Sequence, residues 1–373
     1  MLAPFLLLAI LAFLQALLVS ALLTPLAKRV ARPLGMVDQP GLERKIHTEP
    51  IPRSGGLAIF TAFWGCLLLN VALAVWLVPQ LAFLPEGIRL YAANVADFSA
   101  DSPGRKLLGI ACGALIIFVL GAVDDAKNLP AKLRLAVQTL ATVPLIASGV
   151  VIRFFLPDPV GWALTALWVV FLTNSLNFLD NMNGLTSGLA VIMALVLALL
   201  SALSGEWFML LAFVLLAGAA MGFWFFNFPK ASIFLGDSGS THLGFLFAAL
   251  TTVATYYEEG VPTRLPILMP VIVLGVPIFD TLSVMWIRWR AGRSLMEGDK
   301  NHFSHRMVDL GMTRTGAVLF IYGTALCTGL AAVALRRLDT AYGLVQLAVV
   351  ALVFLGIYVM ERVSRRRGAS AAP

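Results

Sequence analysis

Two adjacent aspartates, Asp124 and Asp125, close an apolar stretch of the sequence in the motif Gly-Ala-Val-Asp-Asp. Carboxylates this close repel each other, and a bound proton or cation relieves the repulsion. Hard cations such as Mg²⁺ prefer oxygen ligands of this kind. The pair therefore indicates a site for a cation or for proton transfer, with a solvated helix end as the alternative.

An amide-rich stripe closes a second apolar stretch further along the chain. Asn174, Asn177 and Asp180 recur at helical spacing, so they lie along one face of a helix, and Asn181 and Asn183 follow directly. Lipid cannot satisfy polar groups, so this stripe must face protein or water. Hydrogen bonding between membrane helices is the alternative, but the density of amides favours a binding site.

A third polar segment, Gly236 to Ser240, is rich in glycine and serine, and its Asp237 follows Asn227 by ten residues. Its small residues expose backbone N–H groups ahead of an apolar helix, which suits a phosphate at a helix N-terminus. Asp237 would supply an oxygen ligand to Mg²⁺ at the same place. An ordinary turn, in which serine or aspartate caps the helix, is the alternative.

A fourth polar segment carries two histidines three residues apart, His302 and His305, followed by Arg306. The sequence has only four histidines and no cysteine or carboxylate cluster that would complete a zinc site. Histidines beside an arginine suit a diphosphate better. Asp280 precedes this loop near membrane depth, where an ionisable residue is by default a functional candidate.

In the first polar loop, Lys45 and Arg53 precede the glycine pair Gly55-Gly56. Basic residues followed by glycines suit an anion, and anchoring at lipid headgroups is the slightly favoured alternative. Each of these signals is modest alone. Together, carboxylates, a phosphate-binding loop and Lys, His and Arg side chains are what a Mg²⁺-assisted phosphoryl transfer needs.

The apolar stretches between these motifs predict an all-α, polytopic integral membrane protein. Of the 373 residues 60% are hydrophobic and 13% charged, and the mean hydropathy is +0.89, whereas a soluble domain has about 45–50% apolar residues. Apolar runs of roughly 18 or more residues can cross a bilayer as helices. We expect ten or eleven such helices, near 4–23, 55–79, 106–123, 134–151, 158–176, 186–203, 207–226, 241–257, 265–287, 315–334 and 341–360.

The distribution of basic residues predicts an outer N-terminus and a cytoplasmic C-terminus. In this orientation the cytoplasmic segments and their edges hold 20 of the 27 Lys and Arg residues, and the outer ones hold 7. All the motifs above then reach the cytoplasmic side, where they can meet in one cleft. The chain is interpreted as one membrane-embedded domain, 1–373, with a basic cytoplasmic tail at 361–373. Its net charge of +7 does not call for nucleic acid, because the basic residues lie beside the spans.

In this order and combination the motifs resemble those of the polyprenyl-phosphate N-acetylhexosamine-1-phosphate transferases, glycosyltransferase family 4. The resemblance runs from Lys45 to Arg306 and includes the aspartate pair, the Asn-rich acidic motif, the Asn227–Asp237 spacing and the histidine loop. The Gly-Asp-Ser-Gly-Ser form resembles the WecA/TagO branch, whereas the related MraY branch has three successive histidines in the last loop. The chain departs from the family pattern at Asn181, Asn183 and Ser304.

The resemblance implies transfer of a sugar 1-phosphate, with N-acetylglucosamine (GlcNAc) favoured, from a UDP-sugar to undecaprenyl phosphate, with release of UMP. It implies Mg²⁺, with Mn²⁺ as the alternative, held by Asp237 and Asn177. Asp124 and Asp125 would be catalytic, Asp124 on the lipid phosphate and Asp125 also beside the metal. The residues that it implies for substrate binding are Lys45, Asn174, Asp180, Asn183, Asn227, His302, His305 and Arg306.

The expected setting is the bacterial cytoplasmic (inner) membrane, with UDP-GlcNAc, the lipid acceptor and membrane lipids as partners, and a homodimer is compatible with the sequence. The product would serve the synthesis of a cell-envelope polysaccharide. One alternative is a transferase of the phospho-MurNAc-pentapeptide type. A transporter or flippase is the other, and it would gather its polar residues near the bilayer midplane rather than at one face.

Overall fold

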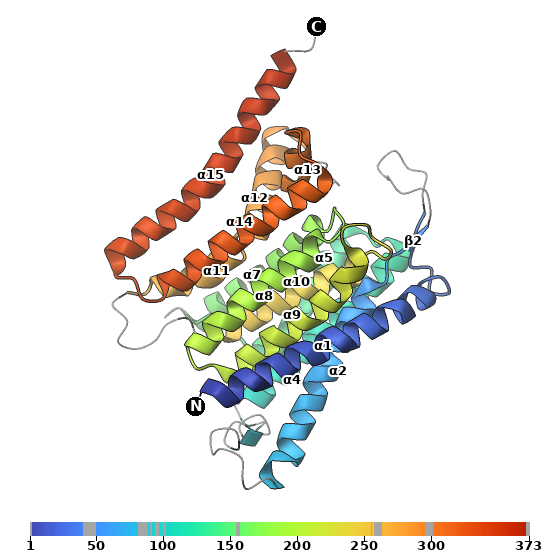
Figure 1. Ribbon diagram of the computed structural model, residues 1–373, viewed down its shortest axis with the longest axis vertical. Coiled ribbons are helices and arrows are strands. Elements are labelled where there is room, and N and C mark those ends of the chain that lie inside the picture. The colour runs from blue at the N-terminus through green and yellow to red at the C-terminus, as the bar shows by residue number, and fades with distance from the viewer. Residues whose placement is uncertain are drawn as a thin grey trace.

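The protein is a bundle of α-helices in the computed structural model (Figure 1). The structure describes residues 2–39, 50–80, 89, 92, 93, 97, 99, 102–153, 157–254, 256, 263–294 and 301–370, without the side chains of 2–4, 79 and 363–370. Two short strands, β1 (Val37–Asp38) and β2 (Ile51–Pro52), pair antiparallel. The helices are α1 (Leu2–Ala31), α2 (Gly55–Trp76), α4 (Pro103–Lys127), α5 (Ala131–Leu140), α6 (Thr142–Ala147), α7 (Asp158–Leu179), α8 (Leu185–Leu203), α9 (Trp207–Asn227), α10 (Gly236–Val253), α11 (Met269–Val273), α12 (Gly275–Arg290), α13 (Phe303–Asp309), α14 (Arg314–Leu335) and α15 (Thr340–Ser370), with the 3₁₀ turns η1 (Val78–Gln80) and η2 (Leu265–Leu268).

The expectation of an all-α polytopic membrane protein is confirmed. Within the described residues, eight helices are long and apolar enough to cross a bilayer: α1, α2, α4, α7, α8, α9, α14 and α15. The segments 265–273 and 275–290 form a ninth candidate, which bends by 73°. Each predicted span therefore corresponds to helical structure, while the number of spans and their orientation stay predictions.

Besides this bent segment, which lies at the span predicted for 265–287, two of the eleven predicted spans do not form long apolar helices. The span predicted at 134–151 is divided between α5 and α6, which meet at Ala141. The span predicted at 241–257 corresponds to α10, which begins at Gly236, so its first turns are polar. Because α10 is buried along almost its whole length, it needs contacts with protein rather than an apolar surface for lipid.

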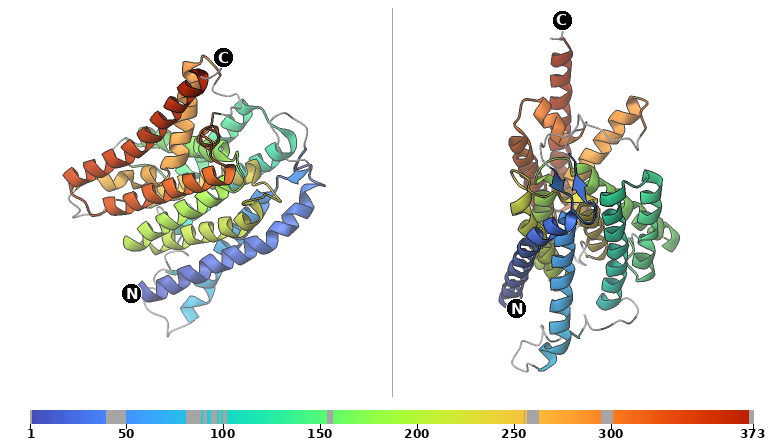
Figure 2. Two further views of the ribbon diagram at one scale, coloured as in Figure 1. Left: turned by 45° about the horizontal axis from the view of Figure 1, so that its top comes forward. Right: turned by 90° about the vertical axis from the view of Figure 1, so that its right-hand side faces the viewer.

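The central helices are covered by others, and the outer helices expose their apolar side chains. In Figure 1, α7, α8, α9 and α10 lie in the middle of the bundle, with α1 on one side and α14 and α15 on the other. In α8, 78% of the residues in the helix's most apolar stretch are buried, whereas in α15 the corresponding share is 17%. Figure 2 shows the C-terminal part of α15 extending beyond the bundle. The exposed leucines and valines of the outer helices suit contact with lipid rather than water.

The helix directions bring the polar motifs to one end of the bundle. There α4, α7 and α9 end, while α2, α8 and α10 begin. The start of α2 is joined to the start of α10, because the N–H groups of Gly55 and Gly56 donate to the carbonyls of Phe234 and Leu235 at 3.0 and 2.8 Å. Segments far apart in the sequence are therefore held next to one another at this end.

Candidate active site

The end of α4 lies against the first turn of α10. Gly121 permits this approach, because a Cβ there would lie 2.5 Å from the Cα of Ser238. Asp125 follows one turn later, and its Oδ1 accepts the N–H of Asp237 at 2.7 Å, while its Oδ2 accepts the N–H and the hydroxyl of Ser238 at 2.9 and 2.7 Å. Its side chain is fully buried. Asp125 thus supplies the negative charge that a helix N-terminus favours.

This arrangement corrects one reading of the glycine-rich segment. The sequence suggested that its backbone N–H groups hold a phosphate of the substrate, but those of Asp237 and Ser238 already donate to Asp125. Gly236 makes the turn into α10 with a φ of 77°, and a Cβ there would lie 2.3 Å from the carbonyl oxygen of Arg53. The anion at this helix N-terminus is therefore a side chain of the protein itself.

Asp237 points away from its own helix N–H groups, toward α7 and the β2–α2 connection. Its Oδ1 accepts the side-chain N–H of Asn177 at 2.6 Å, and Asn177 also donates to the hydroxyl of Ser240 at 3.0 Å. Its Oδ2 lies 3.6 Å from Nη2 of Arg53. Burial, and to a lesser extent the nearby carboxyl of Asp124, raises the pKa of Asp237, while Arg53 and Asn177 partly offset the rise. Asn177 thus orients this carboxylate.

Asp124 points away from α10, toward the start of α5. Its Oδ1 accepts the N–H of Leu129 at 2.6 Å, and its Oδ2 forms an ion pair with Arg134 at 2.8 Å. The carboxyl group of Asp124 also influences Asp237, whose pKa it raises. Sequence reasoning did not single out Arg134, although a basic residue at the polar start of the next helix was a signal for it.

Asp180 completes a group of four carboxylates with Asp124, Asp125 and Asp237. It follows α7 directly, and burial together with the charge of Asp237 raises its pKa to about 7. Among the described residues two arginines pair with this group: Arg53, at 3.6 Å from Asp237 and 3.8 Å from Asp125, and Arg134, at 2.8 Å from Asp124. Four carboxylates against two arginines leave an excess of negative charge, which a divalent cation would neutralise.

The donor set fits Mg²⁺ bound together with substrate phosphates. No three His, Cys, Asp or Glu side chains of the described residues converge as a complete metal cage. Mg²⁺ commonly binds through one or two carboxylates and completes its coordination with water and phosphate oxygens. Asp237 and Asp180 offer such a pair, since both are half-buried carboxylates, and burial first and neighbouring carboxylates second raise their pKa values. Burial also raises the pKa of Asp125, to about 7, but both of its oxygens accept hydrogen bonds from the first turn of α10.

The sequence analysis undervalued Arg53, because it slightly favoured a role for the first loop in anchoring the chain at lipid headgroups. The backbone N–H of Arg53 donates to the carbonyl of Met36 at 2.9 Å, and the carbonyl of Pro52 accepts the N–H of Phe234 at 2.8 Å. The strand pair and the segment before α10 therefore fix where the guanidinium lies. Lys45, the other basic candidate of this loop, lies outside the described residues.

Asn227 stabilises the chain segments around the site through its hydrogen bonds. It is buried, and its Oδ1 accepts the N–H of Gly184 at 2.8 Å and the hydroxyl of Ser187 at 3.1 Å, while its Nδ2 donates to the carbonyl of Ile233 at 2.9 Å. These bonds join the end of α9 to the start of α8. Asn227 was expected to bind substrate, but the structure directs both its oxygen and its nitrogen to the chain.

The two outer members of the amide stripe also contact the chain. The Nδ2 of Asn174 donates to Oε1 of Gln138 at 2.6 Å, which joins α7 to α5. This is the interhelical hydrogen bond that was the alternative for the stripe. Asn183 is exposed, and its Nδ2 donates to the carbonyl of Pro229 at 3.2 Å. Of the predicted stripe, Asn177 and Asp180 reach the carboxylate group.

The histidine loop docks on the end of α7. Nδ1 of His302 lies 2.8 Å from Oδ2 of Asp280, whose Oδ1 accepts the N–H of Phe303 at 2.5 Å, so Asp280 fixes both the ring and the start of α13. The hydroxyl of Ser304 donates to Oδ1 of Asn181 at 2.5 Å. Two of the positions at which the chain departs from the family pattern therefore contact each other and join α13 to the residue after Asp180.

The two remaining candidates of the histidine loop differ in their surroundings. His305 is half-buried, and burial together with the charges of His302 and Arg314 lowers its pKa, so the ring is neutral at pH 7. Arg306 points away from the carboxylates: it pairs with Glu361 of α15 at 2.8 Å and donates to the hydroxyl of Ser283 at 2.9 Å. The structure therefore does not bring Arg306 to the group around Asp237.

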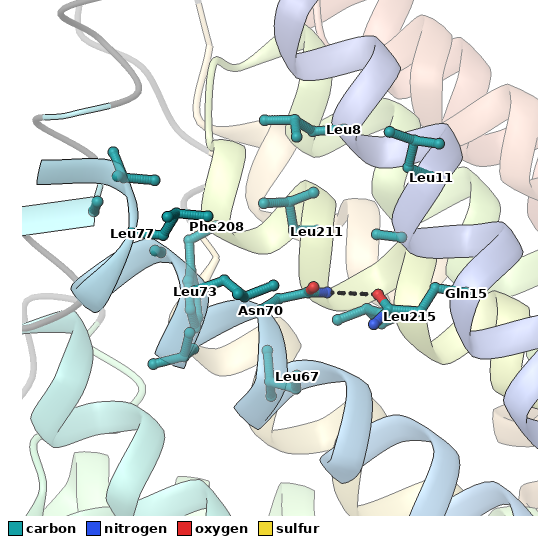
Figure 3. A pocket seen from close by; sticks show the side chains of 15 residues that line it. Leu8, Leu11, Gln15, Leu67, Asn70, Leu73, Leu77, Phe208, Leu211 and Leu215 are labelled. Atoms are coloured by element: carbon teal, nitrogen blue, oxygen red, sulfur yellow. Dashed lines mark hydrogen bonds between the residues drawn. The ribbon is translucent and has the colours of Figure 1, made fainter. Parts of the chain in front are cut away.

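An apolar cavity of about 430 Å³ lies between α1, α2 and α9, with the Nδ2 of Asn70 donating to Oε1 of Gln15 at 3.0 Å in its wall (Figure 3). On α2 its lining begins at Leu67, twelve residues after Gly55, which is about 18 Å along a helix. This cavity is therefore separate from the carboxylate group.

Comparisons with known proteins agree on one kind of enzyme. The sequence pattern of glycosyl transferase family 4 matches residues 107–255. The chain is 32% identical over 336 residues to a probable undecaprenyl-phosphate N-acetylglucosaminyl 1-phosphate transferase of Bacillus subtilis, a match that covers 88% of this chain and 85% of the relative. It is 33% identical over 337 residues to a decaprenyl-phosphate N-acetylglucosaminephosphotransferase of Mycobacterium tuberculosis, covering 83% and 78%. An undecaprenyl-phosphate alpha-N-acetylglucosaminyl 1-phosphate transferase of Yersinia pestis is 27% identical, covering 88% and 85%.

Proposed function

The chain belongs to the polyprenyl-phosphate GlcNAc-1-phosphate transferases of glycosyl transferase family 4, and from this premise we propose how its residues carry out the reaction. It transfers GlcNAc 1-phosphate to a polyprenyl phosphate. The donor is UDP-GlcNAc and the acceptor undecaprenyl phosphate, at the cytoplasmic face of a bacterial inner membrane. The observation that supports the position of the active site is the group of four carboxylates, which lies where α4 and α7 end and α10 begins.

An oxygen of the acceptor phosphate attacks the sugar-linked phosphorus, and the bond from that phosphorus to the oxygen of UMP breaks. A phosphate monoester loses its second proton with a pKa of about 6, so the acceptor is already a nucleophile at pH 7. Asp124 therefore has little need to act as a strong base. Its ion pair with Arg134 instead fixes a guanidinium that can orient the acceptor phosphate. Of the two roles that the resemblance implies for Asp124, deprotonating or orienting the lipid phosphate, this favours the second.

Asp237 and, in place of Asn177, Asp180 would hold Mg²⁺, because Asn177 donates its side-chain N–H to Asp237. The cation would neutralise the diphosphate oxygens and the carboxylates around them. Arg53 adds a second positive charge beside Asp237. This charge stabilises the negative charge that spreads over the oxygens of the phosphoryl group during transfer. Asp125 keeps the first turn of α10 in place, and Asn177 orients the Asp237 carboxylate. The protein thus contributes positioning and charge, which dominate phosphoryl transfer.

The sugar and nucleotide lie on the α13 side of the carboxylate group. Asp280 fixes the ring of His302, and its Nδ1 contact leaves Nε2 as the nitrogen for the donor. The hydrogen bond of Ser304 to Asn181 holds α13 at the end of α7, one residue after Asp180. We place UDP-GlcNAc between α13 and the end of α7. The dependence on Mg²⁺ and the location of the site at the cytoplasmic face belong to the same proposal.

Replacement of Asp237 by asparagine tests the site. Asparagine preserves the size of the side chain but removes the charge, so we expect UMP release from UDP-GlcNAc to fall by about 10²–10³ at saturating Mg²⁺. Asp158→Asn, at the exposed first turn of α7 away from the site, is the matched control. If Asp237→Asn retains the activity of the control, the assignment of the metal side is wrong.

A further inference from the structure

A pocket of about 250 Å³ lies between α12 and α15, apart from the carboxylate group. Its floor is the buried ion pair between Arg306 and Glu361, at 2.8 Å. Arg306 also donates to Ser283 at 2.9 Å. The charges of the floor therefore compensate each other within the protein.

The rim of the pocket is positive. Arg290 and Arg362 both line it and both are exposed. The guanidinium carbon of Arg362 lies 5.3 Å from the centre of the Tyr358 ring, within the range of a cation–π contact that holds the arginine toward the pocket. With three arginines and one glutamate in its lining, the pocket carries an excess of two positive charges.

The pocket lies at the ends of two candidate membrane spans. Arg290 is the last residue of the bent candidate span, and Arg362 is the last residue of the candidate span in α15. Trp286 and Trp289 lie side by side on α12, with ring centroids 5.1 Å apart and side chains 47% and 65% exposed. Exposed tryptophans with arginines beyond them are typical of the membrane–water interface.

We propose that this pocket binds the headgroup of an anionic diacyl phospholipid. The phosphodiester lies between Arg290 and Arg362, and the acyl chains run along the exposed apolar side chains of the two helices, such as Leu282 and Leu355. A basic pocket between membrane helices, open toward the interface, matches the charge and the shape of such a lipid. A soluble phosphate would make the ionic contacts only.

The bound lipid would connect two parts of the protein that are otherwise weakly joined. α15 is the most exposed of the candidate spans, and it meets α12 through the stacked rings of Phe279 and Phe354, whose centroids lie 4.9 Å apart. Arg306 belongs to α13, the helix that also carries His305. A lipid that neutralises Arg290 and Arg362 would hold α15 against α12 and so support the position of α13.

The test is a lipid titration of the purified full chain by native mass spectrometry, with dioleoyl phosphatidylglycerol and dioleoyl phosphatidylcholine as probes. We expect the wild type to prefer phosphatidylglycerol. Because each arginine near an anionic lipid contributes about a fivefold preference, Arg290→Gln with Arg362→Gln should weaken phosphatidylglycerol binding about 25-fold. The lysine pair, Arg290→Lys with Arg362→Lys, should retain most of it, which separates loss of charge from a disturbed fold.

The matched control is Arg29→Gln with Arg32→Gln, which removes two exposed arginines from the end of α1, on the face predicted to be cytoplasmic. This variant should lose far less phosphatidylglycerol binding than the Arg290/Arg362 glutamine pair, because neither of its arginines lines the pocket. Equal binding of the two lipids, or wild-type binding by the Arg290/Arg362 glutamine pair, would overturn the proposal. So would displacement of phosphatidylglycerol by inorganic phosphate or by the polyprenyl phosphate acceptor at an equal concentration, since either would assign the pocket to another ligand.

Discussion

Replacing Asp125 by asparagine separates the roles of the two adjacent aspartates. One carboxylate oxygen accepts the N–H of Asp237, and the other accepts the N–H and the hydroxyl of Ser238. Asparagine keeps one acceptor but turns an NH₂ group toward Ser238, so a buried N–H loses its partner. An unpaired buried donor costs about 1–3 kcal/mol, and a hydrogen bond to a charged group contributes about 1.5–3 kcal/mol. We therefore expect Asp125→Asn to destabilise the fold by about 3 kcal/mol.

The assay is thermal unfolding of the purified chain, measured with EDTA and with Mg²⁺. If Asp125 caps α10, the loss of stability is present in EDTA, because the capping bonds need no metal. If Asp125 served only as a metal ligand, its neutralisation in EDTA would relieve repulsion within the carboxylate group and leave the stability unchanged or raised. A variant that is as stable as the wild type in EDTA but no longer stabilised by Mg²⁺ would refute the capping argument.

Three further predictions concern charge at the site. Arg53→Gln should lower kcat for UMP release by about 10²–10³ while leaving Mg²⁺ affinity equal or higher, because a positive charge 3.6 Å from Asp237 is gone; weaker Mg²⁺ binding would contradict this. Since Mg²⁺ must displace the proton of Asp180, whose pKa is raised to about 7, Mg²⁺ affinity measured by titration should rise from pH 6 to pH 8, and a flat profile would exclude Asp180. Asp280→Asn frees the ring of His302 and should raise KM for UDP-GlcNAc about tenfold, with Asp339→Asn as the exposed control; an unchanged KM would separate His302 from the donor.

The sequence predicts the elements of this fold well because lipid imposes a simple rule. A helix in contact with lipid must be apolar, so α1 and α15, whose side chains are largely exposed, are plain in the hydropathy. The rule weakens for α10, which other helices enclose and which can therefore begin with polar turns. Alternation of helix direction then brings the polar ends together, which is why the association of Asp124, Asp180 and Asp237 could be predicted.

Roles within the site depend on directions that the sequence does not specify. Successive residues of a helix point about 100° apart, so Asp124 reaches Arg134 while Asp125 reaches the backbone of α10. Adjacency suggested a shared function, but the neighbouring helices divide the pair. The side chain of Arg306 likewise follows α15, an element that no local motif connects with the histidine loop.

The division between Asp125 and Asp237 explains how α10 can carry a functional carboxylate in its first turn. An acidic side chain in the first turn of a helix is ordinarily stabilised by the partial positive charge of the free N–H groups there, which lowers the pKa of the carboxyl group. In this chain Asp125 of α4 takes the N–H groups of Asp237 and Ser238. Asp237 is thereby released toward Asn177 and Arg53, where burial and its acidic neighbours raise its pKa. The stability of the helix and the readiness to bind a cation thus rest on different aspartates, so the loss of either one should affect a different measurement.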